Sequence, residues 1–152
     1  MGFRSSEEAL SELNRCLDWL ASEDVVELAA ECMGDDLKAL ESITNRVQAE
    51  SIRRLKRFDS GHGYTASNSL SAASWLRWQC KLTGPGAFSR VCVARRIDGL
   101  PQTQAAFAQG EISFRHAALI TTTSEQCGPN WGEEAESTLV EAARRTDPYQ
   151  LR

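Results

Sequence analysis

The sequence lacks the cysteine pairs on which disulfide frameworks and structural zinc sites are built. Its five cysteines are widely spaced and no two of them form a C-x-x-C pair. A zinc site with four ligands needs cysteines or histidines at short spacing. We therefore expect no metal and five reduced, mostly packed thiols, which are Cys16, Cys32, Cys80, Cys92 and Cys127.

Long apolar runs are absent too. No segment approaches the roughly 18 consecutive apolar residues that a membrane span needs. The N-terminal sequence MGFRSSEEALSEL has no unbroken apolar core of the kind found in a signal peptide. The hydrophobic fraction of 41% is ordinary for a globular protein. These features predict one cytoplasmic domain over residues 1–152 with no membrane partner.

Side chains that commonly carry catalysis are scarce, because the chain has only two histidines. His62 lies in a glycine-rich segment and is expected in a loop at a helix end rather than as a ligand or general base. His116 is expected to be partly buried and hydrogen-bonded, and Asp98 to form a turn. We expect no catalytic residue, no cofactor and no small-molecule substrate, so this chain is predicted not to be an enzyme.

The alternation of apolar and polar residues that is typical of a β-strand is also missing, whereas apolar residues recur at helical spacing along the whole chain. We therefore predict an all-α bundle of about eight helices. Ser5 and Glu8 have the spacing of a capping box at the start of the first helix. The apolar stripe of that helix consists of leucines at 10, 13, 17 and 20.

The remaining helix boundaries follow from capping residues, glycines and prolines. A short helix is expected between Ser22 and Gly34, and a long one starting at Asp35. Helices are then predicted over 69–81, 86–97, from Pro101 to Gly110, from Ser113, and over 133–146, with loops at 59–65 and 127–132. In the last full helix, Ala135, Leu139, Val140 and Ala143 are expected inside, and Glu133, Glu134, Glu136 and Glu141 on a solvated face. The sequence 147–152 reads as another helix start in which the chain stops.

Charge is distributed unevenly. Residues 1–50 carry 12 acidic and 4 basic side chains, residues 51–100 carry 2 and 9, and residues 101–152 carry 7 and 4. The net charges are therefore −8, +7 and −3. Because phosphate contacts depend on local charge, any polyanion is expected to bind the middle third.

Within that third, a helix over 69–81 places Arg77 and Lys81 on the side opposite its apolar face, with Trp78 beside them. Such a tryptophan could stack against a nucleic acid, or it could pack on a neighbouring helix beneath the Lys and Arg stems. The basic end of the preceding helix is either a solvated helix end or part of the same binding patch. Its cations are Arg53, Arg54, Lys56 and Arg57.

The helices over 69–81 and 86–97 are spaced like a helix-turn-helix. The second is apolar around nearly its whole circumference, with Arg96 on its one polar line, so we expect it to be buried. A recognition helix must instead present several polar side chains to base edges. Any DNA contact is therefore expected to be made with the phosphate backbone and with little base readout.

Several motifs together resemble the bacterial 13E12 repeat family, which is catalogued as domain of unknown function 222. They are RRLKRFDSGHG at 53–63, AASWL at 72–76, VARRIDGLPQTQAAFAQGEIS at 93–113 and EAARRTDPYQLR at 141–152. The family pattern has a shorter connection than the LTGPG segment found here. The likeness extends from about residue 8 to the end of the sequence.

The resemblance implies the helical domain that precedes an HNH nuclease domain in proteins similar to products of mobile elements. It thus implies a DNA-associated accessory role. An HNH site needs a catalytic His and a metal-binding cluster, and His62 and His116 lie far apart in this chain. The sequence is therefore expected to be non-catalytic by itself and truncated before a nuclease half. The alternative is a helical interaction or homodimerisation module without nucleic acid.

Overall fold

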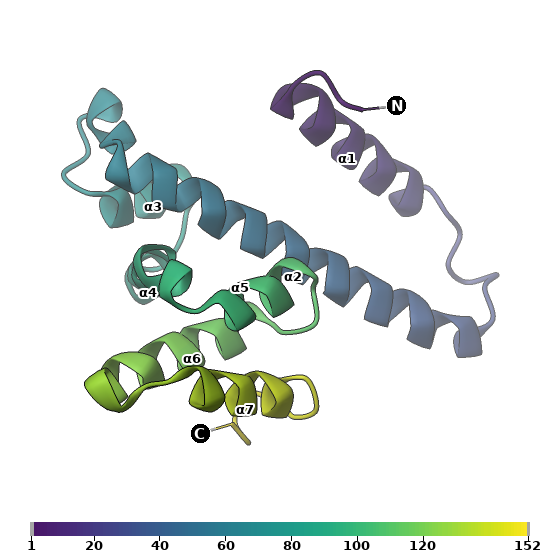
Figure 1. Ribbon diagram of the computed structural model, residues 1–152. Helices are drawn as coiled ribbons and strands as arrows, with labels where there is room; N and C mark the ends of the chain where they lie inside the picture. Colours follow the sequence, from purple (N-terminus) through teal and green to yellow (C-terminus); the bar gives the residue numbers. More distant parts are fainter. Residues whose placement is uncertain (1, 152) are drawn as a thin grey trace. The chain divides into compact units, whose positions relative to one another are not determined.

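A computed structural model describes residues 2–151, and it confirms the prediction of an all-α fold. Within these residues every regular element is helical and there is no strand. The chain divides into two compact units, Met1–Leu37 and Lys38–Arg152. The single domain expected over residues 1–152 stays a prediction. The α-helices of Figure 1 are α1 (Ser6–Ala21), α2 (Ala30–Ser60), α3 (Ala72–Gln79), α4 (Gly84–Arg96), α5 (Pro101–Ala108), α6 (Phe114–Cys127) and α7 (Glu133–Ala143). Three short 3-10 helices are η1 (Gly63–Ser67), η2 (Ile97–Gly99) and η3 (Gly128–Asn130).

The first helix starts as predicted, but it ends at the residue that was expected to start a second helix. The Ser5 hydroxyl accepts a hydrogen bond from the Glu8 amide and caps α1. The Ser22 amide and hydroxyl both bond back to carbonyl groups of α1, so this residue ends a helix rather than starting one. The prediction of a short helix between Ser22 and Gly34 is therefore wrong. Residues 22–29 form turns, and Gly34 lies inside α2.

The long helix α2 extends further in both directions than predicted. It begins at Ala30, so Asp35 lies inside it rather than at its start, and it continues to Ser60. Two residues of the predicted 59–65 loop therefore belong to α2. Ile52 and Leu55, near its C-terminal end, are buried in the core of the larger unit.

The predicted pair of helices in the middle of the chain is present as α3 and α4, which pack against each other. Ser71 caps α3 and Thr83 caps α4, each through its side-chain oxygen. In Figure 1, α4 is seen nearly end-on while α2 runs across the view. The first helix of the pair is shorter than the predicted 69–81.

Burial of α4 is confirmed on one side of the helix but not around nearly its whole circumference. Val91, Val93 and Ala94 are almost completely buried. Phe88, however, is 65% exposed, which corrects the expectation that the apolar residues around nearly the whole circumference of α4 are buried. It lies seven residues before the exposed Arg95, and residues seven apart share one side of a helix. That side of α4 faces solvent.

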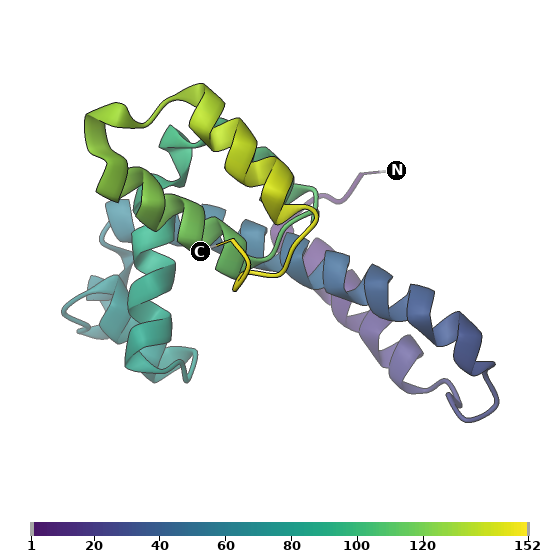
Figure 2. The same cartoon turned by 90° about the horizontal axis from the view of Figure 1, so that it is seen from below.

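The C-terminal helices form the rest of the core. The helices α5, α6 and α7 all contact one another, and Figure 2 shows α6 and α7 side by side. Pro101 occupies the first turn of α5 and Ser113 caps α6, both as predicted. The last helix ends at Ala143 rather than at 146. The largest buried side chains of this region are Phe107, Ile112, Ile120 and Val140.

A glycine allows the loop after α5 to lie against α2. Gly110 has a φ of 79°, and a Cβ atom placed on it would lie 2.5 Å from the Ser42 carbonyl oxygen and 3.0 Å from the Arg46 Cγ atom. The Asn45 side chain also donates a hydrogen bond to the Gly110 carbonyl, at 3.5 Å. Only glycine tolerates both this backbone conformation and this close approach.

Several individual side chains differ from the sequence-based expectations. Cys16, Cys32, Cys80 and Cys127 are exposed and Cys92 is half-buried, so the prediction of mostly packed thiols is wrong. All five thiols are free, as expected. Ala135, expected inside, is exposed on α7.

Candidate nucleic-acid interface

The basic end of α2 is partly neutralised by an acidic residue of the same helix. Arg53 and Arg54 both bond to Glu50, with distances of 2.7 Å from each Nε atom to a carboxylate oxygen. These contacts follow from the spacing, because residues three and four positions apart share a helix face. The hydrogen bond from Arg53 is the largest influence on Glu50 and lowers its pKa to about 2. Two of the eight candidate residues thus share one counter-ion.

Two further ion pairs join the end of α2 to α4 and η2. Lys56 pairs with Asp98, and Asp59 accepts two hydrogen bonds from the Arg95 guanidinium, at 2.7 and 3.1 Å. The hydrogen bonds that Arg95 donates to Asp59 raise the pKa of Arg95. The expected turn at Asp98 is a 3-10 turn that also supplies a carboxylate. The role of Asp59 was not foreseen from the sequence, since its partner is 36 residues away.

Arg96 also has a carboxylate partner, because it forms an ion pair with Glu125 of α6. Its side chain remains partly exposed, in agreement with the prediction that Arg96 lies on the polar side of its helix. A phosphate group that contacted Arg96, Lys56 or the Glu50 pair would compete with a carboxylate that is already bound.

The other candidates lie at the surface without such a partner. Within residues 2–151, the structure pairs none of Arg57, Arg77 and Lys81 with a carboxylate. Trp78 is 67% exposed, so the reading in which it packs on a neighbouring helix is wrong. Trp75, by contrast, packs against the core and contacts the Phe58 ring at a centroid distance of 4.7 Å.

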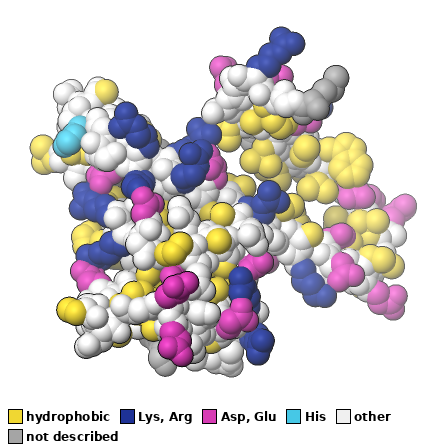
Figure 3. Space-filling model, in the orientation of Figure 1, with side chains coloured by type: hydrophobic (Ala, Val, Ile, Leu, Met, Phe, Trp, Pro, Cys, Tyr) yellow, Lys and Arg dark blue, Asp and Glu magenta, His cyan; other side chains and the backbone are white. Residues whose placement is uncertain are grey.

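The end of α3 fixes where these exposed groups lie. Lys81 adopts a left-handed backbone conformation with a φ of 58°, and its ammonium donates a 2.8 Å hydrogen bond to the Trp78 carbonyl. The Arg77 side chain lies beside Gly84, the first residue of α4, since a Cβ atom there would be 3.8 Å from Arg77 Nε. The N-terminus of a helix carries partial positive charge, which adds to that of the guanidinium. Figure 3 shows Lys and Arg side chains gathered at the surface on the side where α3 and the end of α2 lie.

The predicted role of His116 is confirmed. Its Nδ1 atom accepts a hydrogen bond from the Ser113 amide, so Nε2 carries the proton and donates to the Thr146 carbonyl at 3.0 Å. Burial lowers the pKa of His116, while the Thr146 bond and the nearby Asp147 charge act in the opposite direction. The neutral imidazole thereby joins the start of α6 to the segment after α7. His62 is exposed, with a left-handed φ of 54°.

A second polar contact in the core was missed by the sequence analysis. Glu136 was expected on a solvated face but is only 2% exposed. Its Oε1 atom accepts hydrogen bonds from the Thr103 amide at 2.8 Å and the Thr103 hydroxyl at 2.9 Å. The carboxylate therefore caps the first turn of α5 from a neighbouring helix. Helical periodicity could have indicated this, because Glu136 lies four residues before Val140 and seven before Ala143, which share its side of the helix and are buried. Glu133, Glu134 and Glu141 of the same helix are exposed as predicted.

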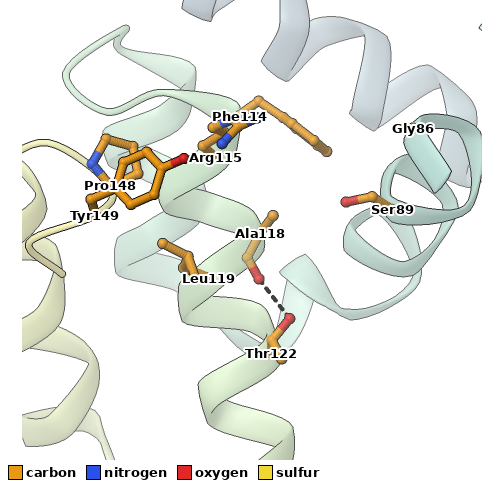
Figure 4. A pocket seen from close by; sticks show the side chains of 9 residues that line it. All are labelled: Gly86, Ser89, Phe114, Arg115, Ala118, Leu119, Thr122, Pro148 and Tyr149. Atoms are coloured by element: carbon orange, nitrogen blue, oxygen red, sulfur yellow. Dashed lines mark hydrogen bonds between the residues drawn. The ribbon is translucent and has the colours of Figure 1, made fainter. Parts of the chain in front are cut away.

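A cavity of about 370 Å³ lies between α4, α6 and the turn at 147–149. Figure 4 shows the Phe114 and Tyr149 rings, the Arg115 guanidinium and the Ser89 hydroxyl around it. None of the eight candidate residues lines it. Its lining contains no carboxylate, so its only full charge is the positive one of Arg115. No motif in the sequence pointed to this cavity, because its lining comes from three separate segments.

Two further properties concern the described part of the chain as a whole. Residues 2–151 contain no group of three or more His, Cys, Asp or Glu side chains arranged to hold a metal ion. None of the helices in this range combines the length and the apolar character that crossing a bilayer requires.

The geometry thus leaves Trp78 and the three cations Arg57, Arg77 and Lys81 exposed on the unit that carries the family motifs, and within residues 2–151 none of these cations is paired with a carboxylate. No curated protein and no solved structure matches the chain. A family match covers residues 35–152, which is most of the sequence and all of the larger unit. On this match, the chain belongs to the family described as Domain of unknown function (DUF222).

Proposed function

We propose that this chain is a DNA-associated accessory domain that contacts the phosphate backbone and reads few bases. The observation that carries the proposal is the exposed surface around α3, where Arg77 and Lys81 flank Trp78. Unpaired cations can release counterions from DNA without first breaking an internal ion pair. The exposed indole beside them can stack on a base or pack against the sugar-phosphate backbone.

The expected lack of base readout also has structural support. The side chains of α4 that would have to reach base edges are largely committed elsewhere. Arg95 and Arg96 are held by Asp59 and Glu125, while Val91 belongs to the core. A helix held in this way would have to give up buried apolar surface in order to enter a major groove.

Membership of the DUF222 family and the resemblance to the 13E12 repeat proteins support a partnership with an HNH-endonuclease-like activity. In this proposal the helical domain holds DNA while a separate HNH domain supplies the metal and the catalytic histidine. The chain by itself is proposed not to cut DNA. Nicking of a plasmid by the purified chain in the presence of Mg²⁺ or Mn²⁺ would contradict that part of the proposal.

The binding proposal is tested with duplex DNA over a range of salt concentrations. Affinity is expected to fall linearly with salt on a logarithmic plot, and the slope to drop by about 0.9 for each phosphate contact removed. We expect Arg77→Gln with Lys81→Gln to weaken binding and reduce the slope. Trp78→Ala is expected to weaken binding with little change in slope.

The matched control is Arg53→Gln with Arg54→Gln, which removes the same charge from residues already paired with Glu50. We expect this control to have a smaller effect than the variant at 77 and 81. Absence of binding at low salt, or binding that does not depend on salt, would refute the proposal. Equal effects of the two double variants would place the contact elsewhere on the basic surface.

A further inference from the structure

The two helices in the middle of the chain each carry an exposed aromatic ring. Trp78, near the end of α3, is 67% exposed, and Phe88, in the second turn of α4, is 65% exposed. Both residues lie in the unit Lys38–Arg152, where α3 and α4 pack against each other. Neither ring belongs to the hydrophobic core of the described residues, so both are available to a ligand.

Arg77 lies close to both of the segments that carry these rings. A Cβ atom placed on Gly84, the first residue of α4, would be 3.8 Å from Arg77 Nε. Phe88 follows Gly84 by four residues, and residues four apart lie on the same side of a helix. The Arg77 side chain therefore lies next to the side of α4 that carries Phe88, while Trp78 is the next residue along α3. The two rings and this cation thus belong to one small region of the helix pair.

Lys81 adds a second positive charge to this region. Its ammonium donates a 2.8 Å hydrogen bond to the Trp78 carbonyl, which keeps the charge at the end of α3. Within residues 2–151 neither Arg77 nor Lys81 forms an ion pair with a carboxylate. The surrounding residues 51–100 carry 2 acidic and 9 basic side chains, so charge favours a polyanion here. We call Arg77, Trp78, Lys81 and Phe88 the α3–α4 platform.

We propose that the α3–α4 platform binds single-stranded DNA in preference to duplex DNA. This inference rests on the proposed function and specifies its substrate. In a duplex the flat faces of the bases are covered by their neighbours, whereas a single strand can expose them. Aromatic side chains stack on such faces with little regard to sequence, and cations beside them hold the phosphates. The platform provides both kinds of group, from Trp78 and Phe88 and from Arg77 and Lys81.

A duplex can use less of the same surface. Reading a major groove needs a helix with several free polar side chains, and the two arginines at the end of α4 are held by carboxylates. Contact with the backbone alone depends on how many phosphates the protein neutralises. Of the eight candidate residues within the described part of the chain, three are cations without a carboxylate partner, which are Arg57, Arg77 and Lys81. Stacking therefore adds an interaction that is open to a single strand and closed to the interior of a duplex.

The preference is tested with a labelled thymidine oligonucleotide and a duplex that contains the same number of phosphates, both at the same low salt concentration. We expect the single strand to bind about tenfold more tightly, because stacking one base on an aromatic side chain changes affinity by roughly that factor. Trp78→Ala and Phe88→Ala are each expected to lower single-strand affinity by about tenfold. The loss of duplex affinity is expected to be much smaller in both variants.

The matched control is Leu70→Ala, because Leu70 is 94% exposed, lies ahead of α3 and has no ring. It should leave the affinity for both DNAs unchanged. Trp78→Phe keeps a ring at the same position and should retain more single-strand affinity than Trp78→Ala. Since Trp78 and Phe88 are exposed, we expect all four variants to keep the helical content of the unmodified chain by circular dichroism.

The outcomes separate this inference from the proposed function. Equal affinity for the two DNAs, or single-strand binding that neither alanine variant weakens, would overturn the inference. Backbone contact would still stand in that case if duplex binding depended on Arg77, Lys81 and salt. Binding of the single strand without any duplex binding would support the inference and refute the proposed duplex contact. Failure to bind either DNA would refute both.

Discussion

The buried carboxylate of Glu136 offers the sharpest test of how this fold is stabilised. One of its oxygens accepts both hydrogen bonds available from Thr103, at 2.8 and 2.9 Å, and the side chain is almost completely excluded from water. Glu136→Ala would leave a buried amide and a buried hydroxyl without an acceptor. Hydrogen bonds to charged groups contribute about 1.5 to 3 kcal/mol each. Because both end on one oxygen, we expect a total loss of about 3 kcal/mol in the free energy of unfolding.

Glu136→Gln separates the hydrogen bonds from the charge. The amide oxygen of glutamine can still accept from Thr103, so we expect a loss of only about 1 kcal/mol, the difference between charged and neutral hydrogen bonds. Urea unfolding followed by circular dichroism measures both variants. Glu134→Ala, an exposed change of the same kind in the same helix, is expected to stay within about 0.5 kcal/mol of the original.

The reasoning fails if Glu136→Ala is no more destabilising than Glu134→Ala, because the capping bonds would then contribute nothing. It fails as well if Glu136→Gln costs as much as Glu136→Ala. In that case the negative charge at the start of α5, rather than the geometry of the acceptor, would be the source of stability.

Two further predictions concern the packing of the larger unit. Gly110→Ala should lower the free energy of unfolding by about 3 kcal/mol or more, because backbone strain adds to the overlap with α2. Gly128→Ala, also at positive φ but in open space, carries backbone strain without the overlap and should therefore lose less than Gly110→Ala by the same urea assay; equal losses would contradict the packing argument. For His116, burial favours the neutral form in the folded state, so the unfolded chain binds more protons and stability should fall as the pH drops below the ordinary histidine pKa of 6.5. His116→Gln should reduce this pH dependence in thermal melts between neutral and mildly acidic pH, and an unchanged dependence would refute the assignment.

Local signals in the sequence predicted most of the fold. The caps at Ser5 and Ser113 and the proline at the start of α5 all lie where expected, because each acts within a few residues of itself. The helix expected after Ser22 failed because the same hydroxyl can cap either end of a helix, and here it bonds backwards to α1. Periodicity alone does not distinguish these two uses.

The candidate interface was harder to predict because charge pairing depends on tertiary structure. Arg95 and Asp59 are 36 residues apart, so nothing in the local sequence shows that each satisfies the other. The exposure of Trp78 was one of two alternatives on the helical wheel, and the packing of neighbouring elements decides between them. Glu136 shows the same limit, since its partner is on a different helix. Sequence reasoning found the basic region, and the tertiary structure divides it into paired and unpaired cations.

A single substitution at Glu50 would change the environment of two arginines near the end of α2. One carboxylate forms ion pairs with two guanidinium groups, those of Arg53 and Arg54, and its pKa is lowered to about 2. Losing that one acid would alter the net charge by a single unit, yet it would remove a carboxylate partner from both arginines at once. The ion atmosphere over this end of the helix therefore depends on one side chain more than on either of the bases around it.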